Sequence, residues 1–297
     1  MNRFFSILAG ICSFNALASP SVLTTTTTLA SIVREIAGDR VRVESILKGP
    51  QDPHYVEAKP SYIASARKAD ALVSVGLGLE SAWLDAVISG SRNPAIRAGG
   101  SGSLALGSLI RPIEVPQGTI DRSMGDVHAE GNPHFYLDPN RVIEVLPAIV
   151  EKLSALDPSG APGYRARSEA FAKTLRSRTT AWGGRIRASG VTAVITYHKT
   201  LGYFLAAFGL RAEGAVEAKP GVPPTAKHLL DLSRSIREKG VRCMLVESFF
   251  DPAPARKVAQ DNAMIVASVA TEVGALAGVT DYGSLIEHLV AAVEACK

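Results

Sequence analysis

Three of the chain's six histidines lie at junctions between predicted strands and helices. His54 lies in the loop "QDPHYVEAKPS", His134 in the loop "GNPHFYLDP", and His198 ends the predicted strand "VITYH". Strand ends are where open α/β sheets place their ligand sites. A neutral imidazole is also the usual protein ligand for a borderline metal such as zinc. One loop histidine alone would more often be an ordinary polar side chain, but three in equivalent positions are candidate metal ligands.

The other three histidines have different surroundings. His228 and His288 fall inside the amphipathic patterns "TAKHLLDL" and "LIEHLVAA", which favour packed or partly exposed imidazoles without a ligand role. His128, in "GDVHAEGNPH", is predicted to be an auxiliary residue that captures the metal, and a solvated loop histidine is the alternative. The chain contains neither an HExxH motif nor clustered CxxC pairs. A metal site would therefore have to be assembled by the folded chain from distant loops.

Strand and helix patterns alternate along the chain, which predicts an α/β fold. The stretch "SVLTTTTTLA" is a predicted strand in which the threonines at 24–28 are β-branched strand residues. A helix is predicted from Asp138 to about Leu156, and a longer one from about Gly163 to Arg187. After the longer helix the alternation restarts with "VTAVITYH". We predict two lobes with parallel sheets flanked by helices, joined by one long helix.

Length and charge limit the function. The 297 residues are enough for two lobes of about 130 residues each. The formal charge of +4 is scattered instead of gathered into a basic block with aromatics, which argues against a nucleic-acid partner. The predicted domains are a signal peptide at 1–18, an N-terminal metal-binding lobe at 19–157, a linking helix at 158–188 and a C-terminal metal-binding lobe at 189–297.

The N-terminus indicates export, and export in turn affects what the cysteines are expected to do. "MNRFFSILAGICSFNALASP" has a short cationic start, an apolar run and a small-x-small sequence, which predict a secretory signal cleaved after Ala18 and a periplasmic location. The alternative is a membrane anchor, although the apolar run is shorter than the ~20 residues that span a bilayer. Cleavage leaves Cys243 and Cys296, and an even pair in an oxidising compartment predicts one disulfide. Two buried free thiols are the alternative.

Several longer stretches resemble a known family. They are "LASIVREIAGDRVRV", "DPHYVEAKPS", "ADALVSVGLGLESAWLD", "GNPHFYLDP", "TYHKTLGYFLAAFGL" and "LVESFFDPAPARKVA". Together they resemble the periplasmic metal-binding proteins that deliver zinc or manganese to ABC-type importers, the type in which a rigid helix joins two lobes. The resemblance implies that His54, His134 and His198 bind the metal. It also implies that the protein is not an enzyme and that its partner is a membrane permease. We expect a monomer, and a separate metal-loading protein stays open as a second partner.

The fourth metal ligand is less clear. The family commonly supplies an aspartate from a "DPLG"-like loop, but this chain reads "IVASVATEVGALAGVTDYGSL" there. Glu272 is the candidate, with a water molecule or Asp281 as alternatives. The family's long histidine-rich insertion is also missing. Asp138 is predicted either to orient a ligand imidazole without touching the metal or to cap the helix that follows it.

Two other functions compete with transport. Three histidines and a water also form a catalytic zinc arrangement, so an exported zinc-dependent hydrolase is an alternative. Such an enzyme needs a general base beside the metal-bound water, and Glu247 in "LVESFF" is the carboxylate to consider. A metal-binding adhesin is the third possibility. Among metals, three imidazoles with at most one carboxylate favour Zn2+, because Mn2+ prefers more oxygen ligands.

Overall fold

The computed structural model describes residues 19–118, 125 and 127–297. The predicted signal peptide, residues 1–18, lies outside the described residues. In the part of the chain that is described, no helix has the length and apolar character needed to cross a membrane.

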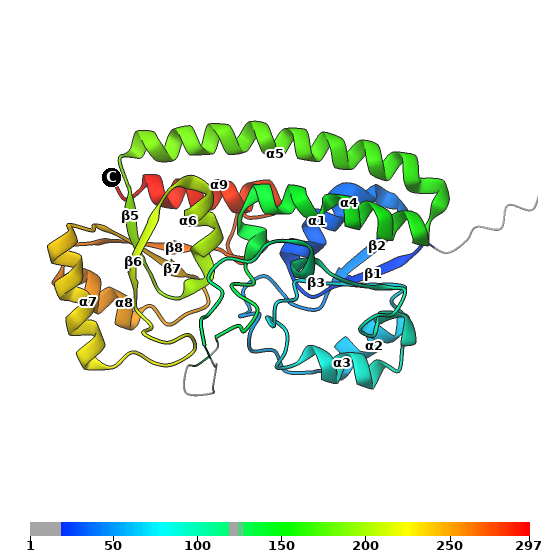
Figure 1. The fold of residues 1–297 in the computed structure, drawn as a ribbon, viewed down its shortest axis with the longest axis horizontal. Coiled ribbons are helices and arrows are strands. Elements are labelled where there is room, and N and C mark those ends of the chain that lie inside the picture. Colours follow the sequence, from blue (N-terminus) through cyan, green and yellow to red (C-terminus); the bar gives the residue numbers. More distant parts are fainter. Residues whose placement is uncertain (1–18, 119–124, 126) are drawn as a thin grey trace, which may run out of the picture.

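The N-terminal lobe is built on a parallel four-stranded sheet in the order β2-β1-β3-β4. Its strands are β1 Ser21–Thr24, β2 Arg42–Ser45, β3 Ala71–Ser74 and β4 Ser103–Ala105. Its helices are α1 Thr27–Ala37, α2 Pro60–Lys68, α3 Leu84–Ser91 and α4 Pro139–Leu156. Parallel strands need helical crossovers, and these helices provide them on both faces of the sheet (Figure 1).

The C-terminal lobe repeats this plan with a second parallel sheet, in the order β6-β5-β7-β8. Its strands are β5 Ala193–Thr196, β6 Arg211–Ala215, β7 Cys243–Glu247 and β8 Ile265–Val269. Its helices are α6 Gly202–Phe208, α7 Ala226–Lys239, α8 Ala253–Asp261 and α9 Tyr282–Glu294. The two sheets therefore bring the carboxyl ends of β2 and β5 toward one central region between the lobes.

Helix α5, Ala161–Ser189, runs along one side of the molecule and spans both lobes (Figure 1). It packs against α1 and α4 of the first lobe and against α9 of the second. Leu175 and Trp182 on its inner side are buried in one continuous core cluster that includes residues of both lobes. The Arg167 side chain donates to the carbonyl oxygens of Ile36 and Ala37 at the end of α1, at 2.7 and 2.9 Å. The predicted fold of two α/β lobes and one long joining helix is confirmed.

One local prediction was wrong. Of the threonines at 24–28, only Thr24 belongs to strand β1, and α1 begins at Thr27. Thr26 is the N-cap of this helix, and its hydroxyl accepts a hydrogen bond from the backbone N–H of Leu29. A threonine hydroxyl can satisfy an unpaired N–H at a helix start, and here this outweighs the weak strand preference of a β-branched side chain. The N-terminus of α1 consequently points into the central region.

The predicted disulfide between Cys243 and Cys296 is confirmed in the structure. Cys243 is the first residue of β7, and Cys296 follows the end of α9. Both side chains are buried, and 53 positions separate them in sequence. The bond fixes the last helix of the chain to a central strand of the second sheet.

Replacing both cysteines by alanine should lower the free energy of unfolding by about 4 kcal/mol, because an unfolded chain without the cross-link gains the entropy of a loop of this length. Urea unfolding of the oxidised wild type and the C243A/C296A variant measures the difference. Equal stabilities, together with free thiols in the unreduced wild type by mass spectrometry, would contradict the prediction.

Candidate metal centre

His54, His134 and His198 meet in the central region between the lobes. One ring nitrogen of each lies within 4.8 Å of the others. His54 comes from the loop between β2 and α2, His134 precedes α4, and His198 follows β5. All three side chains are buried, with exposed fractions of 7%, 2% and 5%. The fold thus brings together three imidazoles from distant loops, as a metal site without a local motif requires.

Each of the three imidazoles has a hydrogen-bond partner at Nδ1. His54 Nδ1 lies 2.7 Å from Asp52 Oδ1, and His198 Nδ1 lies 2.9 Å from Glu217 Oε2. Since a carboxylate accepts, these Nδ1 atoms carry the proton, and each Nε2 keeps its lone pair. A carboxylate behind the imidazole is the usual support for a histidine that binds a metal.

The third imidazole has a different partner, because His134 Nδ1 lies 3.0 Å from the hydroxyl of Tyr136. Among the described residues, the buried Nε2 atoms of His54 and His134 have no hydrogen-bond partner. A buried polar atom without a partner costs free energy unless something binds it. A cation bound between these nitrogens fits that requirement.

The electrostatics of the cluster favour a neutral imidazole at His134. Burial, together with the neighbouring His54 and His198, lowers the pKa of His134 well below its ordinary value. Burial opposes ionisation of Asp52, but the hydrogen bond from His54 prevails and lowers the pKa of that carboxyl. These two shifts favour a neutral His134 at the centre of the site and an ionised Asp52 behind His54.

Glu272 lies close to the site but is not a member of the cluster of three ring nitrogens. Its Oε2 accepts hydrogen bonds from the Thr28 N–H at 2.9 Å, the Thr28 hydroxyl at 2.6 Å and the Thr27 hydroxyl at 3.2 Å. Asp281, the alternative ligand, is the exposed N-cap of α9 and forms a capping box with Ser284. The structure therefore does not bring either carboxylate among the three histidines.

Asp138 caps helix α4. Its Oδ1 accepts from the backbone N–H of Asn140 at 2.8 Å and from the Asn140 side chain at 3.0 Å. The other role considered for Asp138, a contact with an imidazole of the cluster, is taken in this structure by Asp52, Tyr136 and Glu217, which sequence analysis missed. Asp52 and Tyr136 each lie two residues from one of the three clustered histidines, which is a usable sequence signal. Glu217 follows β6, 19 positions after His198, and nothing in the sequence connects the two.

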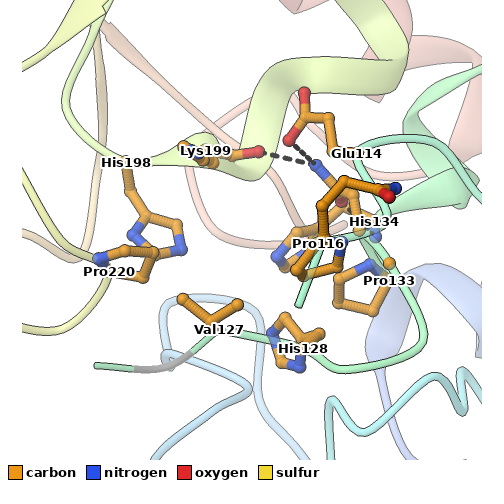
Figure 2. A pocket seen from close by; sticks show the side chains of 12 residues that line it. Glu114, Pro116, Val127, His128, Pro133, His134, His198, Lys199 and Pro220 are labelled. Carbon is orange, nitrogen blue, oxygen red and sulfur yellow. Dashed lines mark hydrogen bonds between the residues drawn. The ribbon is translucent and has the colours of Figure 1, made fainter. Parts of the chain in front are cut away.

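His128 lies next to the cluster. Its ring stacks on that of His54, with centroids 5.3 Å apart, and its centroid is 6.5 Å from that of His134. Figure 2 shows His128, His134 and His198 around a cavity of about 310 Å³. Other residues that line this cavity are Glu114, Pro116, Val127, Pro133, Lys199 and Pro220. His228 and His288 lie in α7 and α9, outside the cluster.

Comparison with known proteins agrees with this architecture. Residues 22–296 match the family model described as "Zinc-uptake complex component A periplasmic". The chain belongs to this family. A crystal structure of ZnuA superposes with a TM-score of 0.77 at 22% identity, covering 94% of this chain and 99% of that one. The Mn-bound periplasmic metal-binding protein of Candidatus Liberibacter asiaticus gives a TM-score of 0.76 at 20% identity, covering 93% and 98%. These two likenesses show the shared fold.

Curated relatives of the zinc-uptake component A family differ in the metal that their names give. The zinc-binding lipoprotein AdcA of Streptococcus pneumoniae is 22% identical over 273 residues, 88% of this chain and 53% of AdcA. This chain thus spans about half the length of that relative. The manganese ABC transporter substrate-binding lipoprotein PsaA of Streptococcus pneumoniae is 25% identical, covering 90% and 86%. The iron-binding protein YfeA of Yersinia pestis is also 25% identical, covering 81% and 73%.

The lowered pKa of His134 predicts how the stability of the metal-free protein depends on pH. The unfolded chain takes up a proton at His134 near pH ~6.5, whereas the folded protein resists this proton. Folding should therefore lose stability as the pH falls from about 7 to about 5. In urea unfolding at several pH values, the wild type should lose more stability over this range than His134→Gln, which cannot take up the proton. Parallel plots of unfolding free energy against pH for the two proteins would contradict this prediction.

Proposed function

We propose that this protein is a high-affinity periplasmic metal-binding protein that carries zinc to an ABC-type membrane permease. The observation that supports the proposal most is the buried set of three imidazoles, whose ring nitrogens lie within 4.8 Å of one another. Two of the ligands come from the proposed N-terminal lobe, residues 19–157, and one comes from the proposed C-terminal lobe, residues 189–297. An ion bound there joins the lobes, and a permease that separates them would release it.

The donor set supports zinc over manganese or iron. Three nitrogen donors suit tetrahedral Zn2+, whereas Mn2+ prefers a shell richer in oxygen and a higher coordination number. The carboxylates of Asp52 and Glu217 bind the far sides of the imidazoles, at Nδ1, instead of the centre. They complement the charge of a divalent ion without adding oxygen to its shell. A water molecule from the adjoining cavity completes a tetrahedral shell.

A zinc hydrolase is the second candidate, and the surrounding carboxylates argue against it. Glu247, at the end of β7, is completely buried, and burial raises its pKa to about 8. It is outside the cluster of ring nitrogens. Asp52 and Glu217 are engaged at Nδ1, and Glu272 is engaged at the start of α1. A hydrolase needs a general base within reach of the metal-bound water, and none of these carboxylates is placed for that work.

Ligand substitution tests the proposal directly. Changing His54, His134 or His198 to alanine should weaken zinc binding by orders of magnitude, because each removes one of three protein donors. His228→Ala and His288→Ala should retain nearly full affinity, since both lie outside the cluster. Competitive titration of chelator-stripped protein with zinc and manganese measures both affinity and preference. Stronger binding of manganese, or full zinc affinity in His198→Ala, would overturn the assignment.

We also propose that His128 captures the ion on its way into the site, because its ring stacks on His54 and lines the cavity that reaches the cluster. His128→Ala should then slow zinc association severalfold while changing the dissociation rate much less. Stopped-flow mixing with a fluorescent zinc chelator measures both rates, with His228→Ala as the matched control. An unchanged association rate would contradict this role.

A further inference from the structure

His134 is the ligand whose imidazole does not contact a carboxylate directly. Its Nδ1 lies 3.0 Å from the hydroxyl of Tyr136, and both side chains are buried, with exposed fractions of 2% and 0%. His54 and His198 each donate to a carboxylate from their own lobe. The support behind His134 must therefore be traced one step further.

The protons around His134 can be assigned from its proposed role as a ligand. A ligand Nε2 must present a lone pair, so the proton of the neutral imidazole is on Nδ1. His134 Nδ1–H then donates to the oxygen of Tyr136, and the phenolic O–H of Tyr136 must donate elsewhere. Glu272 Oε1 is a completely buried acceptor that lacks a hydrogen-bond partner among the described residues. Burial and, after it, the charge of the nearby Glu272 raise the pKa of Tyr136 well above its ordinary value, so this carboxyl group is a neighbour of the Tyr136 hydroxyl.

The other oxygen of Glu272 is held firmly by the opposite lobe. Thr28 donates to Oε2 through both its backbone N–H and its hydroxyl, and Thr27 donates through its hydroxyl. The carboxylate therefore sits at the N-terminus of α1, where unpaired N–H groups and the helix dipole favour negative charge. The backbone N–H of Val273 also donates to the Thr28 hydroxyl at 3.2 Å. Glu272 is also not a member of the group of ring nitrogens that lie within 4.8 Å of one another.

We infer that Glu272 is a positioning residue that acts on His134 through the hydroxyl of Tyr136, and that it is not the fourth metal ligand. The inference rests on the proposed function, since it assigns a role around the same three histidines. The path runs from His134 Nδ1–H to the Tyr136 oxygen, and from the Tyr136 O–H to Glu272. Every proposed ligand imidazole is then hydrogen-bonded to a carboxylate, directly for His54 and His198 and through the Tyr136 hydroxyl for His134.

This path differs from the other two in crossing between the lobes. His134 and Tyr136 precede α4 of the N-terminal lobe, whereas Glu272 follows β8 of the C-terminal lobe. The same carboxylate binds the start of α1 in the N-terminal lobe. The orientation of one ligand thus depends on how the lobes are joined, and the metal shell keeps three nitrogens and an open place for solvent.

Tyr136→Phe and Glu272→Gln test the path from its two ends. Tyr136→Phe removes the bridging hydroxyl and leaves the bonds between Glu272 and Thr28 in place. Glu272→Gln replaces one acceptor oxygen with an NH2 group, which can only donate. The side chain then cannot accept from Tyr136 at one end and from Thr28 at the other. Each variant should lose about tenfold to a hundredfold in zinc affinity, the usual cost of removing a partner behind a ligand. The double variant should lose little more than either single one, since both changes break the same path.

Two further measurements separate positioning from ligation and from general destabilisation. The visible spectrum of the Co2+-loaded protein should show the same coordination number in Glu272→Gln as in the wild type. Asp281→Asn, in the segment between Glu272 and α9, should keep wild-type zinc affinity, because Asp281 caps α9. If Glu272→Gln is too unstable to purify, Tyr136→Phe carries the test alone.

Distinct results would overturn the inference. Wild-type zinc affinity in Tyr136→Phe would remove the path. A changed Co2+ coordination number in Glu272→Gln would make Glu272 a ligand after all. Failure of the wild type to bind zinc or Co2+, with His54→Ala behaving identically, would instead overturn the proposed function on which the inference rests.

Discussion

The structure depends on one constraint, which is that three imidazoles must be buried side by side and remain neutral. Protonated imidazoles at this distance would repel one another, and a buried charge without a partner is costly. Nδ1 of His54 donates to Asp52 and Nδ1 of His198 donates to Glu217, while Nδ1 of His134 lies within hydrogen-bond distance of the Tyr136 hydroxyl. That arrangement fixes the tautomer and leaves the Nε2 atoms facing one another. The Nε2 lone pairs are the atoms' means of binding a cation, and the oxygens at Nδ1 keep these lone pairs available by holding the proton at Nδ1.

The fold satisfies this constraint by placing the ends of strands and helices, with the loops attached to them, at the centre. The ligand loops follow β2 and β5 or precede α4, and α1 presents its N-terminus to Glu272. Helix α5 packs against helices of both lobes and so links the position of one sheet to that of the other. A ligand set shared between lobes needs such a rigid connection, because a small misplacement of either lobe would separate the three nitrogens.

The sequence was informative where the signal was local. The two lobes, the joining helix and the disulfide follow from periodicity and from the even cysteine pair, and the three loop histidines stood out by their common context. The run of threonines misled, because strand preference and helix capping favour the same residue type. The contact of Glu217 with His198 and the contacts of Glu272 with Thr27 and Thr28 could not be predicted. Their partners come together only through sheet order and the packing of the two lobes.

The placement of the carboxylates explains how such a site can be both tight and reversible. A carboxylate bound directly to the ion would add an oxygen donor and favour metals with larger coordination shells. Behind an imidazole it still favours the cation through a hydrogen bond, as Asp52 does for His54 and Glu217 for His198, each within one lobe. Only the inferred path from Glu272 to His134 depends on the lobes staying together. If the lobes separate, as the proposed release of the ion requires, His198 and Glu217 would move away as one unit. His134 would then lose the support that the inferred path brings from Glu272. Opening the molecule would then weaken the site twice, once by removing a ligand and once by releasing the orientation of a ligand that stays.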